Sequence, residues 1–443
     1  MWAAALAAVL LPGPAQAFET FVLPNGLSVL LAPDHAVPVV TVAWAVPVGS
    51  RQEPPGRSGF AHLFEHLMFE GSAHVAKGRF DKTLEGLGAD NNASTHQDHT
   101  FYYETLPSHA LATALWLDAD RLSAPAITEK GLRNQVEVVK EEKRLRIDNE
   151  PYMPLLWVEV ASRSFVNRAS AHDGMGSFAE LEAARLADAK AFFDAHYAPR
   201  GVRLAVAGDF DPAAARARIT RLFGWIPNKA VPEAVDTAEP VQAAALETRL
   251  RDAHASVPGV AVVWTGTPPR GSRESLALAL VGRYLGTGDA ARLRQALVKE
   301  ARVATAVDEP MEGGLGFPNS SLDDYKEPGL FGFFILRRPE ASAEKVLELV
   351  LAEAARVARE GVPPAALERV KARLSGETLR ARQTGLGRAE AWLRAWVLDG
   401  RPEVADADAE AAMTISAEET QAAAAAFLTP ARVNAFILDA GGK

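Results

Sequence analysis

Cysteine is absent from this chain of 443 residues. Without cysteine, the sequence has neither a disulfide framework nor a thiol that could carry a lipid. An excess of positive charge is absent too, because the formal net charge is -9 and no long basic block occurs. This balance argues against a protein that binds nucleic acid or an anionic membrane surface.

The N-terminus lacks an apolar segment long enough to span a bilayer. Its first 17 residues carry no charge, and their apolar run ends at Leu11, just before Pro12-Gly13-Pro14. Ala15-Gln16-Ala17 then has the A-x-A pattern of a cleavage site. A run this short favours a removable signal peptide over a membrane anchor. We therefore expect residues 1–17 to be a signal peptide and the mature chain to be periplasmic or secreted, although a translation start further upstream stays open.

The composition that is present is typical of a globular protein with more than one domain. Hydrophobic residues make up 48% of the chain and charged residues 23%, which is enough apolar material for sizeable cores. A chain of 443 residues is too long for one ordinary domain. The stretch from Pro227 to Ala245 is rich in proline and alanine, as linkers often are. We expect two domains, at residues 18–235 and 245–443.

A repeat supports this division of the chain. The segment from Val37 to Trp44 recurs from Val257 to Trp264, with five of eight positions identical at a spacing of 220 residues. The ends of the two parts are also similar, since Pro199–Ala207 resembles Pro430–Leu438. The sequence therefore predicts two duplicated halves.

Strands and helices are mixed along the chain without a strict β-α-β-α alternation. In the first half, the predicted elements are two short strands around the Asn25-Gly26 turn, strands at 37–46, 92–105 and 202–207, and helices at 58–69, 79–87, 110–122, 128–147, 155–168, 178–197 and 212–223. This pattern predicts an α+β fold, in which helices cover one face of a mostly antiparallel sheet in each half.

The clearest chemical signal is the pattern His62-x-x-Glu65-His66 in the helix predicted at 58–69. Because one helical turn separates His62 from His66, both imidazoles lie on the same side and can bind one metal ion. Glu65 lies on that side as well, where a carboxylate can take a proton from metal-bound water. H-x-x-E-H is the reverse of the commoner H-E-x-x-H motif and is typical of inverzincin peptidases. Two surface histidines beside an ordinary glutamate are the alternative that these five residues alone leave open.

The second half lacks this pattern. At the spacing of the repeat, the two histidines and the glutamate correspond to Gly282, Leu285 and Gly286. In addition, nine of the ten histidines lie between positions 35 and 196. Metal chemistry is therefore expected in the first half alone.

A catalytic zinc ion needs a third protein ligand. In the helix predicted at 128–147, Leu132, Val136 and Val139 form one apolar stripe. Glu142 falls at the rim of this stripe, whereas Glu141 falls on the opposite side, which faces solvent. Since a carboxylate at a core-facing rim is costly unless it is paired or metal-bound, this position favours Glu142 as the ligand. A salt-bridged helix glutamate is the alternative.

Three other histidines are weaker candidates. His96 and His99 stand three apart in the strand predicted at 92–105, so their side chains should point to opposite faces of the sheet. His74 follows Gly71-Ser72 in a predicted loop. We expect all three to be structural or surface residues.

Taken together, these residues resemble the pitrilysin/insulinase family of zinc peptidases, which includes the mitochondrial processing peptidases. The resemblance covers nearly the whole chain after residue 17. The matching stretches are Asn25–Leu27, Gly59–Phe69, Gly71-Ser72, Asn92–Thr95, Asp98–Thr100, Tyr102, Val138–Glu142, Phe192-Phe193, Tyr197–Pro199 and Gly208–Phe210. The family pairs H-x-x-E-H with a glutamate ligand further along the chain, and here the step from His66 to Glu142 is 76 residues.

The resemblance implies a zinc-dependent endopeptidase that acts on peptides or unfolded segments held in a closed chamber. It makes His62, His66 and Glu142 the ligands of one zinc ion per chain, and it makes Glu65 the general base for the attacking water. Asn92-Ala93 corresponds to the edge strand on which family members pair a peptide substrate.

Two features depart from the family pattern. Members often have a second acidic residue seven positions before the glutamate ligand, where this chain has Gln135. Full-length members also carry an Arg and a Tyr in a non-zinc domain that grip the substrate, where this chain has Val298 and Thr305. The chain therefore resembles the zinc-bearing subunit of a two-chain enzyme, with a homologous partner that supplies the Arg and the Tyr. A homodimer is the second choice.

Two other functions stay open from the sequence. One is a non-catalytic structural or interaction subunit of the same fold, although such subunits usually have damaged zinc motifs. The other is a dedicated processing peptidase for one peptide precursor. The sequence identifies neither the substrate nor the partner.

Overall fold

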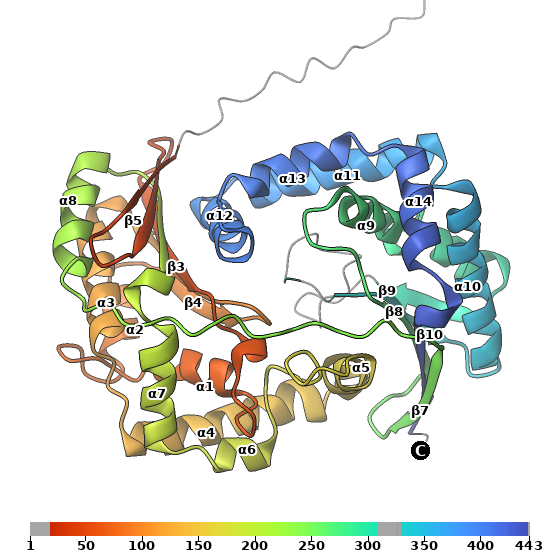
Figure 1. Ribbon diagram of the computed structural model, residues 1–443, viewed down its shortest axis with the longest axis horizontal. Helices are drawn as coiled ribbons and strands as arrows, with labels where there is room; N and C mark the ends of the chain where they lie inside the picture. Colours follow the sequence, from red (N-terminus) through yellow and green to blue (C-terminus); the bar gives the residue numbers. More distant parts are fainter. Residues whose placement is uncertain (1–17, 309–325, 327–328, 442–443) are drawn as a thin grey trace, which may run out of the picture.

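The computed structural model describes residues 18–308, 326 and 329–441. The predicted signal peptide, residues 1–17, lies outside the described residues. Two sheets with helices packed around them make up this part of the chain (Figure 1), so the predicted α+β class is confirmed. No helix within the described ranges is both long enough and apolar enough to cross a membrane.

The first sheet lies in the first half of the chain and has the strand order β1-β2-β6-β3-β5-β4. Its strands are β1 (Glu19–Val22), β2 (Ser28–Pro33), β3 (Val39–Val46), β4 (Asp90–Thr95), β5 (Thr100–Pro107) and β6 (Arg203–Gly208). All pairs are antiparallel except β2 with β6. The valine-rich strand β3 is central, as its continuous apolar run predicts, and β4 is an edge strand.

The second sheet repeats this arrangement, without a strand equivalent to β1, in the order β7-β11-β8-β10-β9. Its strands are β7 (Leu246–Asp252), β8 (Gly259–Thr265), β9 (Ala304–Asp308), β10 (Leu330–Arg337) and β11 (Val433–Ala440). Here too one pair is parallel, β7 with β11, and the others are antiparallel. The similar sequence segments occupy equivalent places, because β8 corresponds to β3 and β11 to β6. The predicted duplication is confirmed by this shared topology.

Each half also contributes a series of helices. The first half contains α1 (Phe60–Leu67), α2 (Arg79–Gly86), α3 (Leu111–Ser123), α4 (Glu129–Lys143) with a π-helical turn at Arg144–Asp148, a second π-helical stretch at Pro154–Glu159 that leads into α5 (Val160–Ser164), α6 (Phe178–Glu182), α7 (Leu186–His196) and α8 (Pro212–Phe223). The second half contains α9 (Arg273–Gly286), a π-helical stretch at Arg294–Glu300, α10 (Ala343–Glu360), α11 (Pro364–Ala381), α12 (Gly385–Asp399), α13 (Val404–Met413) and α14 (Ala417–Phe427).

Both faces of the first sheet are buried, although one covered face was predicted. Val42 and Trp44 of β3 pack into a core with residues of α1, α3, α4, α7 and α8. The alternate residue Ala43 faces the other way, where Trp392 and Leu393 of α12 cover it. In Figure 1, α12 from the second half lies beside the first sheet. Since residues alternate between faces along a strand, β3 is apolar at every position except Thr41 because it has two cores.

A helical segment of the first half packs in the same way on the second sheet. Leu155 and Val160, from the π-helical stretch and α5 of the first half, are buried against Ala261 of β8 and Phe436 of β11. Each half therefore completes the core of the other. Fully burying one large apolar side chain contributes about 1.5–3 kcal/mol, so this exchange holds the two halves together through several such contacts.

The segment predicted as one strand at 92–105 is a hairpin of β4 and β5. Its turn is held by a distant segment, because the N–H of Ser50 donates to the carbonyl of His96 at 3.1 Å. A Cβ atom at Gly49 would lie 2.1 Å from the same carbonyl oxygen, so this close approach requires glycine. The single-strand prediction was wrong because these contacts are remote in sequence.

The helix predicted at 178–197 is divided into α6 and α7. The side chain of Asp188 accepts the N–H of Arg185 at 3.2 Å and the guanidinium of Arg57 at 2.8 Å. This contact from a distant loop starts a new helix at Leu186. The helix predicted at 155–168 is shorter than expected, since helical structure there ends at Ser164.

The exchanged helix gives a first prediction. Trp392→Ala should lower the free energy of unfolding by about 3–5 kcal/mol, because it removes a large side chain from a closed core. Chemical denaturation measures this change. Trp225 is 64% exposed, so Trp225→Ala is the matched control and should cost about 0.5 kcal/mol or less. Equal effects of the two substitutions would contradict the packing of α12 on the first sheet.

Candidate metal centre

The structure brings His62, His66 and Glu142 together between α1 and α4. The Nε2 atoms of the two imidazoles are 3.3 Å apart. The Oε2 atom of Glu142 lies 3.3 Å from Nε2 of His66 and 3.7 Å from Nε2 of His62. The three side chains are 12–21% exposed, so they are sheltered but reachable from solvent.

These three atoms fit the spacing of ligands around a zinc ion. Nitrogen and oxygen ligands about 2.0–2.1 Å from a tetrahedral zinc lie roughly 3.3–3.4 Å from one another. The observed spacings of 3.3, 3.3 and 3.7 Å are close to that value. Among the described residues, this is the one group of three or more His, Cys, Asp or Glu whose ligand atoms lie within 4.8 Å of one another.

The protonation of the two histidines differs. Burial lowers the pKa of His62 to about 4, which keeps this imidazole neutral, as a metal ligand must be. Burial also acts on His66, but the hydrogen bond to Glu142 and the negative charges of Glu65 and Glu142 outweigh it and raise the pKa of His66. The hydrogen bond from His66 in turn lowers the pKa of Glu142, so Glu142 is the carboxylate that offsets the positive charge at this centre.

Helix α4 orients Glu142 as its sequence pattern predicts. Leu132, Val136 and Val139 are buried, and they form the stripe that faces the core. Glu141 is 59% exposed and pairs with Arg144, whereas Glu142 points toward α1. The guanidinium of Arg146, one turn further on, approaches the second oxygen of Glu142 at 3.2 Å.

Glu65 lies beside the two imidazoles on α1. Its Oε2 atom accepts a hydrogen bond of 2.6 Å from the hydroxyl of Thr95 at the end of β4. Burial raises the pKa of Glu65 to about 7, which is in the range where a carboxylate exchanges protons near neutral pH. The sequence gives no signal for this role of Thr95 beyond its place in the stretch Asn92–Thr95.

The start of α1 is held by Glu53, a residue that no sequence pattern marks. Gly59, with φ of 81°, is the N-cap residue, so no side chain caps the helix at that position. Glu53 caps the helix from outside instead. Its two carboxylate oxygens accept the N–H groups of Gly59 and Ala61, each at 2.8 Å. His172 lies 3.0 Å from the same carboxylate. No local pattern marks Glu53 as a cap, because it stands six residues before Gly59.

The predicted substrate residues Asn92 and Ala93 lie on the edge strand β4. This strand runs beside α1 and ends at Thr95, next to Glu65. The N–H of Ala93 points to the Oδ1 atom of Asn92 at 2.9 Å. The open edge of the sheet therefore leads to the three clustered ligand atoms.

The other histidines stay outside this cluster. His96 and His99 lie in the turn between β4 and β5, and their rings stack with centroids 4.4 Å apart. The prediction that they point to opposite faces was wrong, because the strand turns back between them. His74 bonds to Asp120 at 2.6 Å and is 73% exposed.

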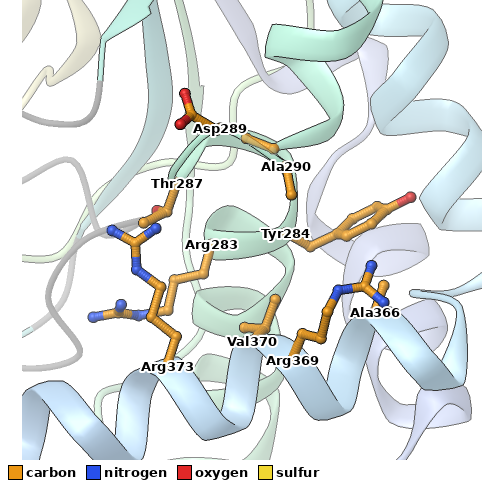
Figure 2. A pocket seen from close by; sticks show the side chains of 10 residues that line it. Arg283, Tyr284, Thr287, Asp289, Ala290, Ala366, Arg369, Val370 and Arg373 are labelled. Carbon is orange, nitrogen blue, oxygen red and sulfur yellow. The ribbon is translucent and has the colours of Figure 1, made fainter.

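The equivalent place in the second half has different chemistry. Gly282, Leu285 and Gly286 lie on α9 and are buried there. On α11, the counterpart of α4, Glu377 pairs with Arg283 at 2.5 Å. Figure 2 shows the neighbouring cavity of about 230 Å³, into which arginines of α9 and α11 project. Guanidinium groups replace imidazoles here, so this half has no equivalent cluster of ligand atoms among its described residues.

Val298 and Thr305 are the two positions of the second half that depart from the family pattern, and the structure describes both. Val298 is partly buried in the π-helical stretch at Arg294–Glu300. Thr305 lies on β9, where its hydroxyl donates to the carbonyl of Leu336 at 3.2 Å. Neither side chain can provide a cation or a phenol.

Two models of one peptidase family match successive parts of this chain. Residues 28–158 match a family model described as Insulinase (Peptidase family M16), and residues 184–374 match one described as Peptidase M16 inactive domain. A Helicobacter pylori protein named zinc protease PqqE is 27% identical over 361 residues, which is 80% of this chain and 77% of that protein.

Solved structures share the fold. A protease from Helicobacter pylori matches with a TM-score of 0.87 at 23% identity and covers 96% of this chain and 100% of that chain. The periplasmic protease PqqL from Escherichia coli matches with a TM-score of 0.73 at 16% identity, over 97% of this chain but 48% of that chain. The Escherichia coli chain is therefore about twice as long as this one.

The orientation of α4 gives a second prediction. Glu142→Gln should weaken zinc binding by more than the roughly 10–100-fold that is typical of losing an outer-shell partner, because it removes a direct ligand charge. Competition with a zinc-binding dye measures the affinity. Glu141→Gln, one residue away and facing solvent, is the matched control and should bind zinc like the unmodified chain. The reverse result would mean that Glu141 is the ligand.

Proposed function

Because the chain belongs to the insulinase family of peptidases, family M16, we propose that it is a zinc-dependent endopeptidase with one zinc ion per chain. The observation that carries this proposal is the convergence of His62, His66 and Glu142, whose ligand atoms have the spacing of a zinc site. A glutamate with its carboxylate at the same place, Glu65, completes the set of groups that peptide hydrolysis needs.

In this proposal, the two imidazoles and Glu142 hold the metal ion, and Glu65 moves the proton. A bound zinc ion would acidify a water molecule and polarise the substrate carbonyl. Glu65 accepts the proton of the attacking water and returns it to the leaving amine. The hydroxyl of Thr95 orients the carboxylate of Glu65 by its hydrogen bond of 2.6 Å.

The substrate is proposed to be a peptide or an unfolded segment of a protein. An extended chain can pair with the open edge of β4 at Asn92 and Ala93, and its backbone then passes Glu65. Pairing with a strand edge requires an extended backbone, which a folded substrate does not offer. A general peptidase and a dedicated processing peptidase share this chemistry.

A homologous partner chain is proposed to complete the substrate grip. The family resemblance implies that Val298 and Thr305 stand where full-length members carry an Arg and a Tyr. The partner would supply these residues from its own second half, so that two chains together resemble one double-length relative. A homodimer is less favoured, because a second copy brings the same Val and Thr.

The two duplicated halves, at residues 18–235 and 245–443, then have different tasks. The first half holds the metal ion and contains the edge strand. The second half stabilises the first half, because its helix α12 covers the other face of the first sheet. Export to the periplasm or the outside of the cell, with removal of residues 1–17, is proposed from the predicted signal peptide.

The role of Glu65 gives a third prediction. Glu65→Gln should retain zinc but lose roughly 10²–10⁴-fold in turnover of an unstructured peptide, because it removes the base and keeps the ligands. Metal analysis and peptide cleavage by the same preparation measure both properties. Undiminished cleavage by Glu65→Gln would rule out the proposed mechanism.

The proposed partner gives a fourth prediction. The purified mature chain should bind zinc but cleave peptides poorly, and co-expression with a homologous chain that has the Arg and the Tyr should raise turnover. Introducing Val298→Arg and Thr305→Tyr together tests the same idea within one chain. Full activity of the unmodified chain on its own would exclude the two-chain arrangement.

A further inference from the structure

One cationic side chain at the metal centre has no part in the proposed mechanism. Arg146 lies on the π-helical turn at Arg144–Asp148, directly after α4, and its side chain is 74% exposed. Its Nε atom lies 3.2 Å from Oε1 of Glu142, whose other oxygen faces the two imidazoles. The guanidinium is therefore separated from the clustered ligand atoms by the width of one carboxylate group.

The ion pair with Glu142 does not explain the presence of Arg146. A pair whose cation is mostly exposed contributes little to stability, because water screens it. A bound divalent metal ion would balance the charge of Glu142 by itself. In the described part of the chain, Glu142 is the one carboxylate within ion-pair distance of Arg146. The positive charge of Arg146 would then be available to a negatively charged group of the substrate.

The guanidinium also keeps its capacity to form hydrogen bonds. Its terminal nitrogens, Nη1 and Nη2, form a planar fork that fits the two oxygens of a carboxylate. Within residues 18–308, 326 and 329–441, the side chain of Arg146 forms no hydrogen bond. Its closest contact, with Glu142, is made through Nε, so the fork can accommodate a ligand.

The turn that carries Arg146 is anchored on both sides. Ile147, the next residue, is buried. Before the turn, the ammonium of Lys143 contacts the carboxylate of Asp173 at 3.1 Å, and both side chains are 10% exposed. π-helical turns are rare and are frequently found at functional sites. This backbone therefore presents the guanidinium to solvent from a defined place beside the metal centre.

The charge of Arg146 acts over a short range. The net charge of the whole chain is -9, so the overall field of the protein does not attract acidic peptides. An extended peptide advances about 3.3 Å per residue, so a group this close to the ligand atoms meets substrate residues within about two positions of the bond that is cut. A preference due to Arg146 is therefore a preference at one or two positions of the substrate.

We propose that Arg146 is a specificity-determining residue, whose terminal nitrogens bind a carboxylate of the peptide substrate close to the bond that is cut. This carboxylate belongs either to an acidic side chain or to the C-terminus of the peptide. The inference rests on the proposed function, because it names the substrate chemistry of the same site.

Peptide binding tests the inference without cleavage. The protein is the Glu65→Gln chain loaded with zinc, with and without Arg146→Gln. The probes are unstructured peptides of one uncharged sequence, each with a fluorophore and an amidated C-terminus. In one series a single Gln is replaced by Glu at each position in turn, and one further peptide has a free C-terminal carboxylate. Fluorescence anisotropy measures the dissociation constants.

With Arg146 present, Glu at one or two positions, or the free C-terminus, should tighten binding by roughly 5–10-fold over the uncharged peptide, as expected for a charge-assisted hydrogen bond. Arg146→Gln should remove this preference, because an amide has no charge to pair with the carboxylate. Added salt should weaken the preference in the chain that retains Arg146. Arg144→Gln is the matched control, since Arg144 lies on the same turn and pairs with Glu141, and the preference should persist in it.

The results distinguish three cases. An effect within the Glu series identifies an acidic side chain as the ligand, and an effect of the free C-terminus identifies the terminal carboxylate. Equal affinity for all peptides, or a preference that survives Arg146→Gln, would overturn the inference. A loss of affinity that is equal for charged and uncharged peptides would also contradict it, because Arg146 would then act only on Glu142.

The zinc content of each preparation, measured separately, tests the proposed function. If the chain binds no zinc, the proposed function fails. The comparison of charged and uncharged peptides then still decides whether Arg146 binds a carboxylate.

Discussion

Helix α1 begins inside the protein, and its first N–H groups need an acceptor that water cannot provide there. The carboxylate of Glu53 is that acceptor, for Gly59 and Ala61. It determines the residue at which the helix starts, and thereby the direction in which each later side chain points. The two imidazoles and Glu65 converge on Glu142 because α1 is fixed at this end and packs against α4 along its length. The geometry of the candidate site therefore depends on how Glu53 holds the buried start of α1.

Duplication gave the chain two similar frameworks, and one of them retains ligand atoms. Apart from β1, which has no counterpart in the second sheet, the two sheets have the same strand order and the same single parallel pair. At the place that corresponds to the imidazoles, the second half has glycines on α9 and an ion pair between Arg283 and Glu377. An arginine beside the glutamate neutralises the charge that a metal ion would otherwise balance. In the second half, an ion pair between α9 and α11 thus stands where the first half has its cluster of ligand atoms.

The sequence predicted those parts of the structure that depend on residues close together in the chain. The helix spacing of His62, Glu65 and His66, and the apolar stripe that turns Glu142 inward, follow from local periodicity. Thr95 and Glu53 could not be found in this way, because each acts on a residue in another element. The stacked pair His96 and His99 was predicted wrongly for the same reason, since the turn between them is fixed by contacts with Gly49 and Ser50. Local patterns therefore pointed to the three side chains that cluster in the structure, and only the folded structure showed which residues contact that site.

The exchanged helices have a mechanical consequence. Trp392 of the second half is buried on the first sheet, and Leu155 of the first half is buried on the second sheet. A cut anywhere in the linker at residues 227–245 would leave these contacts intact, so the two pieces would stay associated without a covalent connection. The linker cannot serve as a hinge between two parts that are interlocked. In a two-chain enzyme, an entrance for a peptide would have to open by movement of one whole chain against the other.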